Sequence, residues 1–474
     1  MKIEIKDNII NKISDAIRGT KFENHVYVAG GYVRDLMMGN ENHDYDFCVD
    51  LPGGGIELAE YLTRMLGGTN VVVYERYGTA QVTVDGFQLE FVMTRKESYG
   101  DDGRNPNVEP GTIHDDISRR DFTINAMVIN ISTGELIDEH DGVADIEAKV
   151  IRTTGDPHTI FEDDPLRILR CIRFASRFNF RIDDVTLIAA RHMSSSVITL
   201  SNERVRDEII KLLSHDNPVT AINMMLLIDL PGCIRLPELT KSVGLLQNDF
   251  HTKDVYGHIL DVVRHSKPTT FHRLAALLHD IGKCHTVSYD DNGVHFIGHE
   301  FISDNIAMTF MSAFKFSNEQ IELVSSAVRN HMRISADISD NKIRKIRSEL
   351  GDEHFFFLLD LCEADRKSHV DCDMSVINHA RELSVKEPRI TGSNLCINGD
   401  DVMKLTGLKP GREVGRLLGL VKDASFLNPG LTVEEAEHIV MLNVTRVPRA
   451  CFKVKCMIKG CQNLASHKVG EENI

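Results

Sequence analysis

The sequence predicts an α+β protein, in which an N-terminal region of mixed strands and helices is followed by an all-helical remainder. The chain has 474 residues, enough for about three domains of roughly 150 residues each. Residues 1–150 mix strand and helix patterns, whereas nearly every segment after Phe161 has helical periodicity. With 42% hydrophobic and 26% charged residues the chain can bury sizeable cores, which excludes disordered and collagen-like proteins.

Charge and cysteine usage exclude further classes. The net charge of −16 disfavours a nonspecific DNA-binding protein and a polybasic membrane binder. The opening segment has no signal-peptide pattern and no run of 18 apolar residues occurs, so we expect a cytoplasmic protein with reduced thiols. The ten cysteines form no C-x-x-C pair, and the spacing of Cys451, Cys456 and Cys461 matches no common zinc motif, which leaves their role open.

The elements follow in order along the chain. An amphipathic opening helix precedes strand-like stretches at residues 26–31, 44–50, 70–84 and 87–94, punctuated by Gly and Asp. Helical patterns then cover residues 163–178, 183–195, 202–214 and 221–232. A second helical stretch, rich in His and Asp, runs from His251 to about His379, and a third unit begins after an extended link. We therefore predict four domains, at residues 1–150, 151–248, 249–388 and 389–474.

Two short motifs near the N-terminus suggest phosphate and metal chemistry. Gly30-Gly31 ends a predicted strand, where missing side chains let the backbone approach a phosphate, and Arg34 lies one turn into the following helix. Asp44 and Asp46 alternate on a predicted strand, so their carboxylates share one face and repel each other unless a cation lies between them. Hard oxygen ligands suit Mg²⁺. A D-x-D alone is usually a solvated strand end, but the preceding glycine loop favours a nucleotide site.

This segment resembles the signature of the polymerase-beta-like nucleotidyltransferase superfamily, specifically the bacterial class II tRNA CCA-adding enzymes and poly(A) polymerases. Four further stretches agree with that family in order and spacing, from Val28 to about Leu213. They are RRDFTINA at 119–126, Asp141-Gly142 with Asp145-Ile146, DDPLRILRCIRFA at 163–175, and SNERVRDEIIKLL at 201–213. The resemblance implies a nucleotidyltransferase head at 1–150 and a helical neck and body at 151–248 for nucleotide selection and RNA binding.

The resemblance also implies roles for individual residues. Asp44 and Asp46 would bind the Mg²⁺ ions that serve an in-line displacement with release of pyrophosphate. Gly31, Arg34 and Arg120 would hold the triphosphate. Asp164 and Arg167 would read the Watson–Crick edge of CTP or ATP, since a carboxylate only accepts and a guanidinium only donates hydrogen bonds.

The predicted neck helix carries Arg167, Arg170, Arg173 and Arg177 on one face. Such a row is self-repelling and predicts an anionic ligand or an acidic facing surface, and the resemblance places Arg170 and Arg173 beside the nucleotide. The chain departs from many relatives by having Asp163 where they carry Glu. The superfamily commonly uses a third carboxylate on a neighbouring strand. Glu90 is the candidate, against the alternatives of an exposed strand position or a structural ion pair.

A second constellation lies in the predicted third domain. His258, His279-Asp280 and Asp365 lie on separate helical segments, and burying His and Asp at the end of the apolar helix costs several kcal/mol unless they are hydrogen-bonded or metal-bound. The set resembles the HD phosphohydrolase fold, with His299 and His331 where two-metal relatives have further histidines. It implies a divalent cation, with Mg²⁺, Mn²⁺, Ni²⁺ and Fe²⁺ all compatible. A helical scaffold without metal is the alternative.

The C-terminal region resembles the last segment of HD-containing CCA-adding enzymes down to GLKPGREVG at 407–415, and predicts either a tRNA contact or a helical packing element. The last stretch is basic and contains no acidic residue up to Lys459. It carries Arg446, Arg449, Lys453, Lys455 and Lys459. It suggests an RNA-contacting tail or a solvated end.

The leading interpretation is template-independent addition or repair of the 3′-terminal CCA of tRNA from CTP and ATP. A poly(A) polymerase shares every head and neck motif, and C-only or A-only addition stays open. A hypothesis of another class makes the chain an HD-domain RNA-end phosphohydrolase with a non-catalytic RNA-binding head, and a third makes it a non-catalytic tRNA-binding protein. The intact Asp44 and Asp46 argue against both. We expect tRNA as partner, no membrane or DNA partner, and a local basic track on an acidic body.

Overall fold

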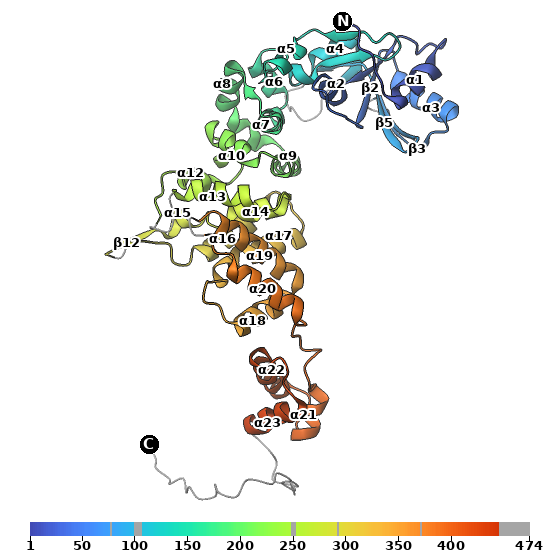
Figure 1. Cartoon of the computed structure of the whole chain (residues 1–474). Helices are drawn as coiled ribbons and strands as arrows, with labels where there is room; N and C mark the ends of the chain where they lie inside the picture. The colour runs from blue at the N-terminus through green and yellow to red at the C-terminus, as the bar shows by residue number, and fades with distance from the viewer. Residues whose placement is uncertain (76–77, 99–106, 248–252, 292, 370–371, 445–474) are drawn as a thin grey trace, which may run out of the picture. The chain divides into compact units, whose positions relative to one another are not determined.

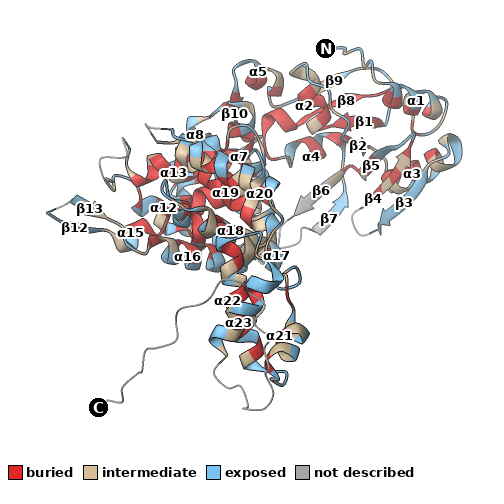
Figure 2. Cartoon of the chain, turned by 60° about the horizontal axis from the view of Figure 1, so that its bottom comes forward, coloured by how far each residue is buried: buried red, intermediate tan, exposed pale blue. Residues whose placement is uncertain are grey.

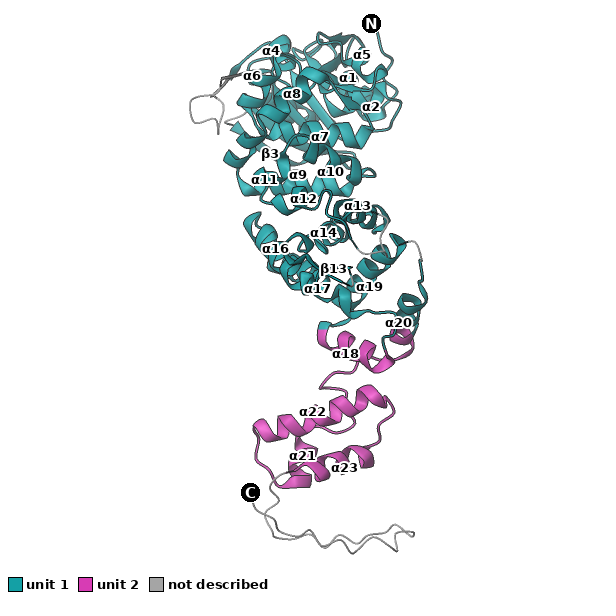
Figure 3. Cartoon of the chain, turned by 90° about the vertical axis from the view of Figure 1, so that its left-hand side faces the viewer, with its two compact units in different colours: residues 1–338, 350–382 teal, residues 339–349, 383–474 magenta. Residues whose placement is uncertain are grey.

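The computed structural model describes residues 1–75, 78–98, 107–247, 253–291, 293–369 and 372–444 (Figure 1). The chain divides into two compact units, one formed by residues 1–338 with 350–382 and one by residues 339–349 with 383–474 (Figure 3). A mixed sheet at the N-terminus and helices elsewhere confirm the α+β prediction. The four predicted domains stay a prediction.

The N-terminal region is built on a seven-stranded mixed sheet in the order β3-β4-β5-β2-β1-β8-β9. β2 and β5 run parallel and the other neighbours antiparallel. The strands are β1 (Val26–Ala29), β2 (Tyr45–Val49), β3 (Thr69–Tyr74), β4 (Thr79–Val84), β5 (Phe87–Met93), β8 (Met127–Asn130) and β9 (Leu136–Asp138). Smaller pairs are β6 (Arg95–Ser98) with β7 (Asn107–Pro110) and β10 (Val150–Ile151) with β11 (Arg181–Ile182).

Side-chain alternation gives this sheet a covered face and an open face. Along β5, Leu89, Phe91 and Met93 are buried while Glu90 is only half-buried, and Phe47 of β2 stacks on Phe91 with ring centroids 4.9 Å apart. α3 covers the apolar face of β4 and β5. The helices of this region are α1 (Asn8–Ile17), α2 (Gly31–Met37), α3 (Gly54–Leu66), α4 (Ile113–Ser118), the short η2 (Thr123–Asn125) and α5 (Gly142–Glu147).

Helices follow from residue 157 onward. The first group consists of α6 (Pro157–Asp163), α7 (Leu166–Phe178), α8 (Asp184–His192), η3 (Ser194–Thr199), α9 (Asn202–Ser214), α10 (Pro218–Leu227), α11 (Leu230–Cys233) and α12 (Pro237–Lys241). α7 begins directly after Pro165, which is favoured in the first turn of a helix because it needs no hydrogen-bond donor there. α7 packs on α9 and α10, and thus joins the sheet region to the helical body.

The second helical group surrounds the apolar helix α14. Its elements are α13 (Val255–His265), α14 (Thr270–Leu278), α15 (Lys283–Thr286), the hairpin β12 (Ser288–Asp290) and β13 (Gly293–His295), α16 (His299–Ala313), α17 (Asn318–Asn330), η4 (His331–Arg333) and α19 (Asp352–Lys367). Figure 2 shows many buried residues along α13 and α19 of this group. Leu274–Leu278 are all buried, and α14 packs against α13, α16, α17 and α19. A burial pattern this complete places the residue after α14 in the interior.

The remaining helices are α18 (Asp340–Leu350), α20 (Ser375–Lys386), α21 (Gly399–Thr406), α22 (Arg412–Leu427) and α23 (Val433–Asn443). α21, α22 and α23 share a small core that includes Val402, Leu417, Val421 and Val440, so this segment is a packed helical element. None of the described helices is long and apolar enough to cross a membrane. The basic stretch from Arg446 to Lys459 and the cysteines Cys451, Cys456 and Cys461 lie outside the described residues.

Candidate active site and metal centre

Three carboxylates lie together on the open face of the sheet. Asp44 directly precedes β2, Asp46 is in β2, and Glu90 of β5 is the register partner of Asp46. Shielding from solvent raises the pKa of the Asp46 carboxyl to about 6, and the charges of Asp44 and Glu90 add to this shift while Arg120 opposes it. Gln81 of β4 donates a hydrogen bond to Glu90 Oε2 at 3.1 Å. Carboxylate oxygens are the ligands that Mg²⁺ prefers, but these three carboxylates are not among the described groups whose ligand atoms all lie within 4.8 Å of one another, so a shared Mg²⁺ would draw their side chains closer.

The predicted glycine loop is held against Arg120. Gly30 has φ 63°, and a Cβ built there would lie 2.9 Å from Arg120 Nη1, so only glycine fits without displacement. Arg120 donates to Asp116 at 3.0 Å and to the Asn125 carbonyl at 3.1 Å. Gly31 opens α2 on the same cleft.

Arg34 of α2 is buried rather than reaching into open solvent. Its guanidinium donates to Asp35 and to Asn125 Oδ1, both at 2.8 Å, and lies 4.7 Å from the Phe178 ring centroid. Burial lowers its pKa, and Asp35 counteracts the shift. The arginine is therefore fixed at the wall of the cleft before any ligand binds.

Two arginines of α7 pair with acidic side chains, which is one of the two outcomes that the sequence predicts for this row of like charges. Arg170 donates to Asp121 at 2.7 Å, and Arg173 donates to the buried Glu208 of α9 at 2.6 Å. Arg167 donates to the backbone carbonyls of Ile160 and Arg119 at 3.2 and 2.9 Å. These contacts fix the arginines at the cleft wall while they still line it.

The acidic residues before α7 lie in the same place. The side chain of Asp164, two residues before α7, accepts from the Leu166 amide at 3.1 Å and from Arg204 of α9 at 2.8 Å. Asp163 lies 4.0 Å from Arg167. Arg204 was not singled out in the sequence, because nothing in the α9 pattern shows that it turns toward α7.

All predicted head and neck residues except Glu90 line one cleft of about 1020 Å³. Nine arginines contribute to it, at positions 34, 95, 119, 120, 167, 170, 173, 177 and 204, against seven acidic residues. Since the whole chain carries −16, positive charge is concentrated where a polyphosphate would bind.

Comparison with known proteins identifies the family. Residues 26–152 match the profile described as "Poly A polymerase head domain", residues 179–230 the "Probable RNA and SrmB- binding site of polymerase A", and residues 297–428 the "tRNA nucleotidyltransferase domain 2 putative". The chain belongs to the bacterial CCA-adding enzyme and poly(A) polymerase family.

Two of the similar proteins match over nearly their whole length. The chain is 28% identical to an A-adding tRNA nucleotidyltransferase of Deinococcus radiodurans, over 87% of this chain and 94% of that protein. It is 26% identical to a CCA-adding enzyme of Enterococcus faecalis, over 89% and 93%. The solved CCA-adding enzyme of Bacillus stearothermophilus in complex with CTP shares the fold at a TM-score of 0.69 and 20% identity, over 91% of this chain and 96% of that one.

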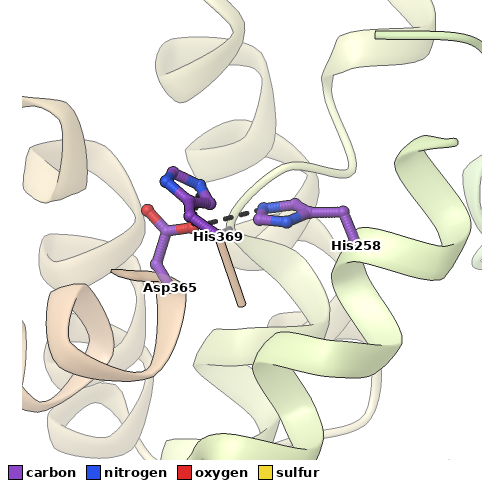
Figure 4. Close-up of side chains that lie close together, drawn as sticks. All are labelled: His258, Asp365 and His369. Carbon is purple, nitrogen blue, oxygen red and sulfur yellow. Dashed lines mark ion pairs between the residues drawn. The ribbon is translucent and has the colours of Figure 1, made fainter. Parts of the chain in front are cut away.

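The second constellation forms a buried centre around Asp280. Asp280 Oδ2 lies 3.2 Å from Nε2 of His258 and of His279, and Oδ1 lies 3.0 Å from His299 and 3.5 Å from His331. Asp365 Oδ1 lies 3.2 Å from His258 (Figure 4). The structure thus brings together all six residues predicted from the sequence.

Backbone carbonyls fix the orientation of three of the histidine rings. Nδ1 of His279, His299 and His331 faces the carbonyls of Ala276, Phe296 and Val328 at 2.8, 2.7 and 2.6 Å. A carbonyl accepts only from a protonated Nδ1, which leaves the Nε2 lone pair directed at Asp280. Lone pairs and carboxylates converging in a buried space suit a divalent cation, so the donor set fits a metal.

The protonation of this centre follows the same geometry. Burial opposes the charged form of His258, but its hydrogen bonds to Asp280 and Asp365 prevail and raise its pKa to about 9. Burial also opposes ionisation of Asp280, yet the surrounding His279 and Lys283 hold its pKa well below the usual value. A cation would therefore displace a proton on binding.

His369 is a further member of this centre that sequence reasoning missed. It follows α19 one turn after Asp365, and its Nε2 lies 3.4 Å from Asp365 Oδ1 (Figure 4). His258, Asp365 and His369 form one of the three donor groups close enough to hold an ion. The i,i+4 spacing from Asp365 was the available signal.

Proposed function

We propose that the protein is a template-independent tRNA nucleotidyltransferase that adds or repairs the 3′-terminal CCA of tRNA from CTP and ATP and releases pyrophosphate. The observation that carries this proposal is the placement of three carboxylates at the edge of a cleft lined by nine arginines. A polyphosphate leaving group and metal-binding carboxylates must meet in any such transfer. The two relatives named above are an A-adding tRNA nucleotidyltransferase and a CCA-adding enzyme. The proposed place of this activity is the cytoplasm, as expected from the sequence.

Each residue has a task in this proposal. Asp44 and Asp46, with Glu90 as third ligand, would hold Mg²⁺, which supplies charge stabilisation at the α-phosphate. Gly31, Arg34 and Arg120 would bind the triphosphate. Asp164 and Arg167 would read the base, and Arg170 and Arg173 would border the nucleotide.

Other members of the same reaction class are distinguished by their product. A poly(A) polymerase would use the same head and neck residues. The relatives of nearly equal length divide between A-adding and CCA-adding enzymes, so both activities act on tRNA rather than on long RNA tails. The two-base specificity is therefore the finer part of the proposal.

The proposal is tested by removing single carboxylates. Asp46→Ala and Asp44→Ala should lower nucleotide incorporation by at least about 1,000-fold while tRNA binding stays within a few-fold, because both residues serve the reaction rather than RNA affinity. Asp85→Asn, in the exposed β4–β5 turn, is the matched control and should incorporate normally. Incorporation by the Asp46 variant at the wild-type rate would contradict the assignment.

We also propose that the buried centre around Asp280 is a metal-dependent phosphohydrolase site of the HD type. His258, His279, Asp280 and Asp365 would hold a divalent cation, with His299 and His331 available for a second one, and the metal would supply an activated water. The adjoining cavity of about 570 Å³ gives substrate room to approach, and Lys283 and Arg366 on its wall suit a phosphate.

Metal content and phosphate release test this second site. Asp280→Asn should lose bound metal and metal-dependent phosphate release while leaving nucleotide incorporation intact. Asp360→Asn is the matched control, because Asp360 is equally a buried carboxylate but pairs with Lys267, His272 and Arg381. Retained stoichiometric metal in the Asp280 variant would contradict the site, and loss of both activities would assign Asp280 to folding.

A further inference from the structure

A second hollow adjoins two of the three carboxylates, Asp44 and Glu90, and shares no arginine with the cleft. It measures about 460 Å³ and is lined by His43, Asp44, Tyr45, Gln81, Gln88 and Glu90. None of these described lining residues is a lysine or arginine. Only His43 and Asp44 also line the arginine cleft, so the carboxylates stand at the boundary between two chemically different spaces.

The geometry of in-line transfer indicates which substrate occupies the arginine cleft and which occupies the hollow. In such a displacement the attacking oxygen and the leaving pyrophosphate lie on opposite sides of the phosphorus. Gly30, Arg34 and Arg120 mark the pyrophosphate side, because they present glycine backbone and positive charge. The attacking 3′-hydroxyl therefore has to arrive from the other side of the carboxylates, which is the hollow beside Gln81 and Gln88.

We propose that this hollow binds the 3′-terminal nucleoside of the RNA primer, with the ring of His43 as its stacking surface. The inference rests on the proposed nucleotidyl transfer and adds where the acceptor end lies. A wall without cations suits a base and ribose better than a phosphate, and separates the acceptor from the incoming triphosphate.

Ring contacts hold His43 in place for stacking. Its ring centroid lies 5.8 Å from that of Phe87, which is 37% exposed at the start of β5, and Phe87 meets Tyr45 edge-on at 5.6 Å. Tyr45 is anchored through its hydroxyl, which donates to Asp7 at 2.8 Å. An exposed ring backed by packed rings offers a flat face that accepts any base.

A chain of amides connects the same hollow to the third carboxylate. Gln88 Nε2 donates to Gln81 Oε1 at 2.9 Å, and Gln81 Nε2 donates to Glu90 Oε2 at 3.1 Å. Gln88 is exposed, so its amide oxygen can accept from the ribose or base of the terminal nucleoside. Gln81 is accordingly a positioning residue for Glu90.

Steady-state kinetics with a tRNA lacking its terminal residues distinguish binding of the primer in the hollow from binding of the nucleotide in the arginine cleft. His43→Ala should raise the KM for tRNA about tenfold, equivalent to ~1.4 kcal/mol, and Gln88→Ala should raise it several-fold. The KM values for CTP and ATP should stay within about twofold. His43→Phe should restore the wild-type KM for tRNA, since any aromatic ring can stack.

His25→Ala is the matched control, because His25 is an exposed histidine at the opposite end of the sheet. Its KM for tRNA should equal that of the wild type, and urea unfolding should show that all four variants fold alike. An unchanged KM for tRNA in His43→Ala and Gln88→Ala, or a rise in the KM for nucleotide instead, would overturn the inference. A wild-type protein that extends no RNA would overturn the proposed function itself.

Discussion

Among single residues, Gly30 combines a positive φ with a close approach to a side chain of the cleft. Its φ of 63° belongs to the left-handed region, and its missing Cβ leaves room for the Arg120 guanidinium. Gly39, at the other end of α2, has φ 74° but no atom within 4 Å of a built Cβ. Both glycines thus have a backbone conformation that would strain another residue, but they differ in the atoms that surround them.

Replacing each glycine by alanine separates strain from site geometry. Both variants should lose about 1–2 kcal/mol of unfolding free energy, measured by urea denaturation, because alanine is strained at positive φ. Only Gly30→Ala should also raise the KM for ATP and CTP, by about tenfold or more, because Arg120 has to move. Equal nucleotide KM values in the two variants would show that the contact with Arg120 is irrelevant to binding.

The positions of individual residues could be predicted from the sequence where they depend on local structure. Asp44 and Asp46 share a face because side chains alternate along a strand. The Gly30-Gly31 pair by itself predicts a turn. Glu90 could be selected only with the register of β2 against β5, which involves residues 44 positions apart. The contacts of His279, His299 and His331 with backbone carbonyls also depend on the folded helices. For His369, the only signal in the sequence was its i,i+4 spacing from Asp365.

At the scale of elements, α7 is held to α9 by a buried ion pair. Arg173 and Glu208 are 8% and 2% exposed, and burial lowers the pKa of Arg173 while Glu208 opposes that shift. The pattern of the sequence predicted both helices, but it left open whether the arginine row meets a ligand or an acidic partner. The structure shows that Arg173 meets Glu208 from α9.

Breaking this pair should be costly. Glu208→Gln leaves Arg173 charged and buried, and we expect a loss of about 3 kcal/mol or more in unfolding free energy. Asp229→Asn, which breaks the exposed pair with Arg191, is the control and should cost less than about 1 kcal/mol. Urea denaturation measures both, and similar small losses would contradict the buried character of the α7–α9 contact.

His215, at the end of α9, adds a pH dependence to the same contact. Burial and the positive charges of Arg273, Arg173 and Arg177 lower its pKa to about 4. The unfolded chain binds a proton near pH 6.5 and the folded one does not, so stability falls as pH decreases from 6.5 toward 4.

A comparison of the wild type with His215→Gln measures the contribution of His215 to the pH dependence of stability. Because His215 is partly exposed, we expect it to account for about 1–2 kcal/mol of destabilisation between pH 7 and pH 4.5. The difference in unfolding free energy between the two proteins should therefore change in favour of the variant as pH falls. A difference that is independent of pH would mean that His215 protonates equally in both states.

At the scale of the whole molecule, charge distribution reconciles an acidic chain with an RNA partner. Nine arginines line one cleft although the net charge is −16. If the arginines of this cleft that the proposal does not assign to the nucleotide neutralise three or four phosphates of tRNA, log K for tRNA should fall against log salt with a slope of about −2 to −3. Filter binding between 50 and 300 mM KCl measures the slope, and a salt-independent affinity would contradict phosphate binding in the cleft.

The most direct test of nucleotidyl transfer to tRNA is the sequence of the product. A tRNA transcript lacking its terminal CCA is incubated with the protein and with CTP, ATP or both, and its 3′ ends are sequenced. We predict CCA followed by arrest when both nucleotides are present, and no product from the Asp46→Ala variant. A long adenosine tail, adenosine added only to ends that already carry CC, or no extension at all would contradict the proposed CCA addition.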